Sequence, residues 1–87
     1  MKIFKVHLKK TAKKELKKLP KMLLPKVLLA LKSLEQNPRP EGSKKLKGEK
    51  EYLWRIRVGN YRVIYLIEEE IKVVEIRKIG HRKDVYF

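Results

Sequence analysis

The clearest pattern in the sequence is an alternation of apolar and polar residues between Trp54 and Tyr65. This alternation predicts two strands, and the Gly59-Asn60 pair between them suits a two-residue hairpin turn, because glycine accepts a positive φ. With this turn, Val58 lies opposite Tyr61. One face of the hairpin then carries the apolar side chains, which are Trp54, Ile56, Val58, Tyr61, Val63 and Tyr65.

The other face of the same hairpin carries Arg55, Arg57 and Arg62. The predicted register places Arg57 directly opposite Arg62, and like charges in opposed positions destabilise a hairpin. Arginine is suited to phosphate because its planar guanidinium keeps its charge and forms two parallel hydrogen bonds. The three arginines therefore indicate an anion-binding face. The alternative is a strand face that is only solvated.

Two helices are predicted upstream of the hairpin, after a short strand at about 2–7. Apolar residues then recur at helical spacing as far as Pro20, namely Leu8, Ala12, Leu16 and Leu19. A second helix is predicted at about 21–36, with Pro25 in its first turn. Its apolar stripe consists of Leu24, Val27, Leu28, Leu31 and Leu34. Because the connection is short, the two helices should form an antiparallel hairpin.

The order of elements predicts an α+β fold. Residues 37–51 read as a long polar loop, and strands are predicted at about 52–58, 61–68 and 71–79. The order is then β-α-α-β-β-β within a single domain that spans residues 1–87. Helices followed by strands are typical of an α+β domain. We expect a helical hairpin packed on the apolar face of an antiparallel sheet, with the arginine face left open.

The composition favours a small domain that uses no metal and no cofactor. The chain has 87 residues and no cysteine, and its two histidines, His7 and His81, are too few for a zinc site without carboxylates. No apolar run is long enough for a signal peptide or a membrane span. We therefore expect a cytoplasmic protein.

The charge of the chain indicates a polyanionic partner. The formal net charge is +14, and residues 1–50 hold 16 lysines and arginines against 4 acidic residues. Nucleic acid is the first candidate for the partner. An anionic membrane surface is an alternative partner. The charge can also be explained without a partner, by lysines that only keep a helix surface soluble.

The last eight residues, Gly80 to Phe87, supply further groups with functional chemistry, namely His81, Arg82, Lys83 and Tyr86. If the last three strands form a meander, this tail emerges at the end of the sheet where the hairpin turns. It would then lie near Arg57 and Arg62. The alternative is that the tyrosine packs on the core.

These groups exclude several kinds of catalytic site. The set has no carboxylate cluster for Mg²⁺, no cysteine nucleophile, no glycine-rich phosphate loop and no Ser-His-Asp arrangement. RNA cleavage by a 2′-hydroxyl needs only charge stabilisation and proton transfer, which arginines and a side chain of suitable pKa can supply. A tyrosine can also stack on a base.

The residues from Trp54 to Tyr65, together with Gly80 to Tyr86, resemble the RelE group of the RelE/ParE toxin superfamily. Three upstream segments also resemble it: Lys14 to Pro20, Asn37-Pro38 and Lys45 to Gly48. The resemblance implies a toxin of a type II toxin–antitoxin system. It also implies a ribosome-dependent endoribonuclease, or mRNA interferase, that cleaves mRNA in the A site without metal. Its partner would be a RelB-like antitoxin that wraps the toxin.

The resemblance also implies roles for individual residues. Arg62 would stabilise the phosphate in the transition state, Arg82 would assist the leaving group, and Tyr86 would orient or stack on a base of the mRNA. Arg55 and Arg57 stand where RelE-type enzymes commonly have lysines, one of them implicated as the general base. Arginine is a poor base because its pKa exceeds about 12.

The remaining candidates are a histidine and several lysines. His81 lies next to Arg82 in sequence and is a candidate proton shuttle, because histidine titrates near neutral pH. The alternative is a surface histidine with no role. RNA contacts are expected from Lys44, Lys45, Lys47 and Lys83, and for each the alternative is a solvated lysine.

Two other functions stay open at this point. One is a ParE-like gyrase inhibitor, which shares the fold. The other is a basic RNA-binding module with no catalysis. The combination of Arg62, Arg82 and Tyr86 favours the nuclease. In either toxin reading, the strongly basic chain should bind an acidic antitoxin.

Overall fold

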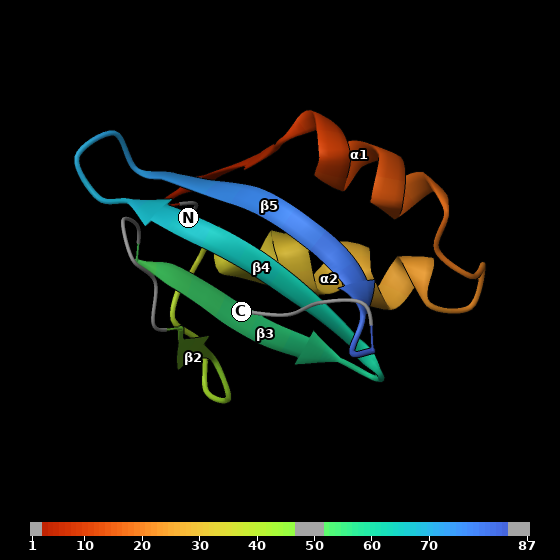
Figure 1. Cartoon of the computed structure of the whole chain (residues 1–87). Helices are drawn as coiled ribbons and strands as arrows, with labels where there is room; N and C mark the ends of the chain where they lie inside the picture. Colours follow the sequence, from red (N-terminus) through yellow and green to blue (C-terminus); the bar gives the residue numbers. More distant parts are fainter. Residues whose placement is uncertain (1–2, 47–51, 84–87) are drawn as a thin grey trace.

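The computed structural model describes residues 3–46 and 52–83. The elements are β1 (Lys5–Leu8), α1 (Lys10–Lys17), α2 (Leu24–Leu34), β2 (Lys44–Lys45), β3 (Leu53–Val58), β4 (Tyr61–Glu68) and β5 (Val73–His81). The strands form one sheet in the order β1-β5-β4-β3-β2. In Figure 1, α2 lies behind this sheet and α1 lies beside β5. The predicted α+β fold, with two helices packed on a sheet, is confirmed.

The sheet is mixed, whereas the sequence predicted an antiparallel one. Three strand pairs are antiparallel, but β1 lies parallel to β5. β4 occupies one edge of β5, and β1 pairs with the other edge, where it runs in the same direction as β5. The pairing extends beyond the strand, since the N–H of Lys9 donates to the carbonyl of Ile76 at 2.9 Å. This contact keeps Leu8 in β1, whereas the spacing of Leu8 from Ala12 and Leu16 predicts that it begins the first helix.

Two further boundaries differ from the sequence prediction. The second helix is shorter than expected and begins at Leu24, with Pro25 in its first turn as predicted. The polar segment 37–51 contains a short strand, β2, at Lys44–Lys45. This strand pairs with β3 and brings Lys44 directly opposite Arg55. Local pattern could not reveal β2, because two consecutive lysines show no alternation.

The hairpin of β3 and β4 has the predicted register. Val58 lies opposite Tyr61, and Arg57 lies opposite Arg62. Gly59 has a φ of +61°, which glycine adopts without the steric cost of a Cβ. A two-residue turn leaves the strands no freedom to slip, so the alternation is preserved along the whole hairpin.

The core lies between the helices and one face of the sheet, here called the core face. Its fully buried side chains include Val63 and Tyr65 from β4, Ile76 from β5 and Val27 from α2. α2 turns its stripe toward them at three-to-four-residue spacing, which is typical of an amphipathic helix. Leu28, predicted in this stripe, is 46% exposed.

A bulge in β5 adapts this strand to the core. Ile64 pairs with Lys78 but Tyr65 pairs with Ile76, so Arg77 is an extra residue in the ladder. A bulge shifts the alternation by one residue. Ile76 and Ile79 can therefore both face the core, although they are three residues apart.

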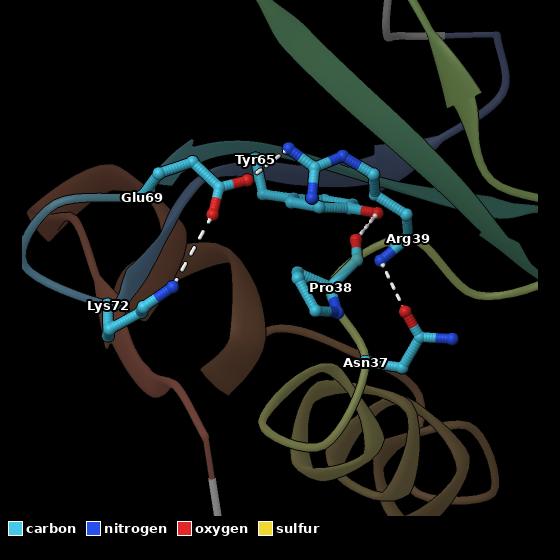
Figure 2. A network of polar contacts seen from close by, with 6 residues as sticks. All are labelled: Asn37, Pro38, Arg39, Tyr65, Glu69 and Lys72. Atoms are coloured by element: carbon cyan, nitrogen blue, oxygen red, sulfur yellow. Dashed lines mark hydrogen bonds and ion pairs between the residues drawn. The ribbon is translucent and has the colours of Figure 1, made fainter.

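A polar network holds the connection between α2 and β2 against the sheet (Figure 2). The buried hydroxyl of Tyr65 donates to the carbonyl of Pro38 at 2.7 Å. The next residue, Arg39, forms an ion pair with Glu69 in the turn between β4 and β5, and its guanidinium lies 5.3 Å from the ring centroid of Trp54. Glu69 also forms an ion pair with Lys72, with 3.8 Å between Oε2 and Nζ. This network fixes the start of the loop that reaches β3.

Candidate functional site

The face of the sheet opposite the core face is rich in cations. Lys44, Arg55, Ile64 and Lys78 form one row across four strands, and the next row contains Arg57, Arg62 and Gly80. We call this surface the arginine face. Because side chains alternate along each strand, these residues share one side of the sheet. The hairpin thus gathers its three arginines as the sequence predicted.

The arginine face places like charges next to one another. Arg57 lies directly opposite Arg62, and Lys44 lies directly opposite Arg55. Burial lowers the pKa of Arg55, and the charges of Arg57 and Arg62 lower it further. Opposed like charges destabilise a strand pair. These arginines therefore reduce the stability of the free protein.

Two guanidinium nitrogens on this face are buried without a hydrogen bond. They are the Nε atoms of Arg55 and Arg62, which have no partner among the described residues. A buried donor without an acceptor costs about 1–3 kcal/mol, and more when it is charged. An anion with several acceptor oxygens would offset both this cost and the repulsion between the arginines.

A hollow of about 330 Å³ adjoins these arginines where β3 extends beyond its pairing with β2. The described residues that line it are Glu41, Gly42, Arg55, Ile56 and Arg57. Gly42 has a φ of +90°, a conformation that favours glycine, and it turns the loop back toward the strand. Glu41 is the one proton-accepting side chain among these described lining residues. The hollow thus combines charge stabilisers with a carboxylate.

Other kinds of site find no support in residues 3–46 and 52–83. No group of three or more histidine, cysteine, aspartate or glutamate residues there could hold a metal ion. Within the same ranges, no helix is long and apolar enough to cross a membrane.

Comparison with known proteins places the chain in a family. Residues 6–86 match the model of the ParE toxin of type II toxin–antitoxin systems. The chain belongs to this family of toxins. Relatives include a candidate toxin RelE1 of Methanocaldococcus jannaschii, 36% identical over 86 residues, covering 95% of this chain and 94% of the relative. Toxin RelG of Mycobacterium tuberculosis is 34% identical over 84 residues and covers 95% of each.

Solved toxin structures share the fold of this toxin. The RelE–RelB complex of Pyrococcus horikoshii matches with a TM-score of 0.82 and 33% identity, over 95% of this chain and 99% of that one. The isolated RelE toxin of Escherichia coli matches with a TM-score of 0.73 and 26% identity, over 90% and 83% of the two chains. The predicted membership of the RelE/ParE superfamily is therefore confirmed.

The structure brings Arg82 of this toxin to the expected end of the sheet. The N–H of Arg82 donates to the carbonyl of Asn60 at 2.8 Å, so Arg82 lies beside the turn that follows Arg57. Lys44 lies on the arginine face, whereas Lys45 lies over the ring of Tyr52, 4.2 Å from its centroid. Lys83 is exposed next to His81. Tyr86 and Lys47 lie outside the described residues.

His81 does not join the arginines, and its expected position was wrong. It pairs with Tyr61 at the end of β5, and the two rings meet edge to face with centroids 5.4 Å apart. This position belongs to the core-face side, as does that of Ile79 two residues earlier. Continuing the alternation from Ile79 would have predicted this position from sequence.

Two residues near the arginines were not predicted from the sequence. Glu41 lies in a polar segment without periodicity, and no local signal connects it with β3. Lys78 joins the row of Arg55 only because of the bulge at Arg77. The signal for that bulge is the pair of consecutive polar residues between Ile76 and Ile79.

Proposed function

We propose that this toxin is an endoribonuclease that cleaves mRNA in the ribosomal A site, in the cytoplasm. The observation that supports it most is the pair of buried Nε donors of Arg55 and Arg62, within a cluster of like charges. A phosphodiester supplies the negative charge and the acceptor oxygens that this cluster requires. The proposed RNA binding and the proposed dependence on the ribosome rest on the resemblance to RelE toxins.

The proposed reaction is a transesterification within the RNA. The 2′-hydroxyl loses its proton, and its oxygen attacks the adjacent phosphorus. The bond from phosphorus to the 5′-oxygen breaks, and that oxygen takes up a proton. The products are a 2′,3′-cyclic phosphate and a new 5′-hydroxyl. Arg57 and Arg62 would neutralise the charge that develops on the phosphorane, which is usually the largest contribution to catalysis.

The proton acceptor in this proposal is Glu41. Arginine cannot serve, because it does not lose its proton at physiological pH. The carboxylate belongs to a residue that lines the same hollow as Arg55 and Arg57, which supports this role. Arg82 would stabilise the leaving oxygen from the end of the sheet, and Tyr86 would stack on a base.

The partner in the resting state would be an acidic antitoxin of the RelB type. The structural neighbours include complexes of RelE with RelB. A chain with a net charge of +14 should bind an acidic, partly disordered partner that folds on its surface. Co-purification with the product of the neighbouring gene, followed by calorimetry over a salt series, tests this partner. A neutral or basic neighbour without measurable binding would contradict it.

An in vitro translation reaction tests the proposed activity. We expect the toxin to arrest translation and to produce mRNA ends that primer extension maps to A-site codons. The family model carries the ParE description, so a gyrase inhibitor is the second candidate. Trapped gyrase–DNA complexes without mRNA cleavage would support it. Neither cleavage nor trapping would leave a non-catalytic RNA-binding module.

A substitution at Glu41 tests the proton acceptor separately. We expect Glu41→Gln to lower the rate of mRNA cleavage by about 10²–10⁴-fold. Glu70→Gln, in the turn between β4 and β5, is the control and should cleave at the wild-type rate. Cleavage by Glu41→Gln within a few-fold of wild type would assign proton transfer to another group.

A further inference from the structure

A pair of aromatic rings lies at the end of the sheet, on the side away from the arginine face. The rings of Tyr61 and His81 meet there edge to face, and both side chains are half-buried. The N–H of Lys83 donates to Nδ1 of His81 at 3.2 Å. In a neutral imidazole this leaves the proton on Nε2, as a donor for a ligand. The nuclease chemistry proposed above uses neither ring.

These two rings form part of a hollow of about 290 Å³, here called the end hollow. Its described lining residues are Pro20, Met22, Leu23, Lys26, Asn60, Tyr61 and His81. The connection between α1 and α2 closes it from one side, since Leu23 packs next to the turn at Gly59. Met22 is 89% exposed and forms part of the rim. The walls are thus mainly apolar and aromatic, with one amide and one ammonium group.

This combination matches the chemistry of a nucleotide. Apolar and aromatic walls accept the flat face of a base, and stacking on aromatic side chains is the usual way in which proteins hold single-stranded bases. The amide of Asn60 offers a donor and an acceptor for the edge of a base. Lys26 provides a positive charge for an adjacent phosphate, and no described lining residue is acidic.

A neighbouring hollow is less suited to RNA. It has a volume of about 230 Å³ and is also lined by Tyr61 and His81, with Glu15 among its other lining residues. The carboxylate of Glu15 accepts the N–H of Ile79 at 2.9 Å, which fixes a negative charge there. Lys18 and Lys78 also line this hollow, so the two hollows have the same net charge. Only this one has a carboxylate in its wall, which would repel a nearby phosphate, so the end hollow is the better site.

We propose that the end hollow binds a base of single-stranded RNA outside the nucleotide that is cleaved. This proposal rests on the proposed RNA substrate. Tyr61 and Arg62 are consecutive residues of β4 and lie on opposite sides of the sheet, beside the turn at Gly59-Asn60. One RNA strand that passes around this turn would contact the arginine face and the end hollow together.

Histidine NMR gives a direct test, because the chain has two histidines, His7 and His81. The probe is a tetranucleotide with 2′-O-methyl groups, which the toxin cannot cleave. We expect the ring signals of His81 to shift on titration, whereas those of His7, in β1, stay unchanged. An otherwise identical abasic oligomer should shift His81 much less. Equal shifts with both oligomers, or no shift at saturation, would overturn the proposal.

Substitutions distinguish stacking from charge. We expect His81→Ala to weaken binding of the tetranucleotide about 5- to 150-fold, the range typical for loss of one stacked base. His81→Phe should retain most of the affinity because it keeps the ring. His7→Ala is the matched control. Equal loss in the Ala and Phe variants would overturn the assignment of a stacked base.

The test separates this site from two other outcomes. Binding is measured without ribosomes, so wild-type mRNA cleavage without a shift at His81 would refute the end hollow but keep the proposed nuclease. Conversely, a base-dependent shift without cleavage would keep the end hollow and refute the nuclease. If only the co-expressed antitoxin shifts His81, the hollow accommodates an apolar side chain of a protein, and the proposal fails.

Discussion

The two faces of the sheet obey opposite physical rules. On the core face, Val63, Tyr65 and Ile76 are fully buried among apolar neighbours, and the hydroxyl of Tyr65 has its acceptor in Pro38. On the arginine face, Arg57 lies opposite Arg62, and buried Nε donors have no partner among the described residues. Both faces belong to the same strands, so the backbone does not explain the difference.

The difference shows which face stabilises the fold. The core face provides apolar burial and satisfied hydrogen bonds, whereas the arginine face adds repulsion and unmet donors. A protein retains such unfavourable groups when a ligand uses them. Substitutions on the core face should therefore reduce stability. Substitutions of the arginines on the arginine face should reduce activity and leave stability intact.

The largest effect on stability is expected from Ile76→Ala. Ile76 is 0% exposed between the helices and the sheet, so the substitution leaves a cavity. We expect the free energy of unfolding to fall by about 2–5 kcal/mol, measured by urea denaturation. Ile64→Ala is the matched comparison, because Ile64 is 1% exposed but lies on the arginine face.

The loss at Ile64→Ala should be smaller than at Ile76→Ala. Ile64 is flanked by Arg55 and Lys78, whose long flexible stems can move into the space that the substitution leaves. The cost of a cavity depends on how far its surroundings collapse. A larger loss at Ile64 than at Ile76 would show that the arginine face is packed as tightly as the core.

The next effect concerns the hydroxyl of Tyr65. In Tyr65→Phe the buried carbonyl of Pro38 loses its donor, so we expect the free energy of unfolding at neutral pH to fall by about 1–3 kcal/mol. Activity should change little, because the hydroxyl lies on the core side.

The stability that the hydroxyl of Tyr65 contributes depends on pH in the alkaline range. Burial raises the pKa of Tyr65 from 10.0 to about 12, although the Ser43 hydroxyl and Arg39 oppose the shift. Since the folded protein holds this proton more tightly, wild type loses stability as pH rises from 10 toward 12. Tyr65→Phe lacks this loss, so the difference between the two proteins should narrow over that window. A constant difference would contradict the raised pKa.

The smallest effect is a gain in stability. Arg57→Thr removes one partner of the opposed pair, so we expect the free energy of unfolding to rise by about 0.2–1 kcal/mol at low salt. Lys5→Thr is the control, since Lys5 in β1 lies opposite Val73 and relieves no opposed charge. The gain at Arg57 should shrink in high salt. An equal gain in both variants would attribute it to threonine's preference for strands.

The sequence predicted the hairpin and its three arginines correctly for a specific reason. A two-residue turn and strict alternation determine the register locally, so no distant contact is needed. The parallel pairing of β1 with β5 joins segments that are far apart in the sequence, and no local pattern reveals it. No local pattern reveals the position of Glu41 either, because the network around Arg39 and Tyr65 holds the loop in which it lies.

The position of His81 was predictable in part. The meander correctly brought the end of β5 to the turn at Gly59-Asn60. The predicted side of the sheet was wrong for His81. The prediction grouped His81 with the arginines because of its chemistry and did not follow the alternation of side chains from Ile79. The bulge at Arg77 makes that alternation discontinuous, so it can be read only from Ile79 onward.

We propose that the arginine face serves catalysis at the expense of stability. Arg62→Ala tests it most directly when the rate of ribosome-dependent mRNA cleavage and the free energy of unfolding are measured on the same preparation. We expect the rate of cleavage to fall by about 10²–10³-fold, while the free energy of unfolding stays equal or rises. Arg77→Ala is the control for activity, because Arg77 forms an ion pair with Glu75. Cleavage within a few-fold of wild type, or a loss of stability like that of Ile76→Ala, would contradict the account.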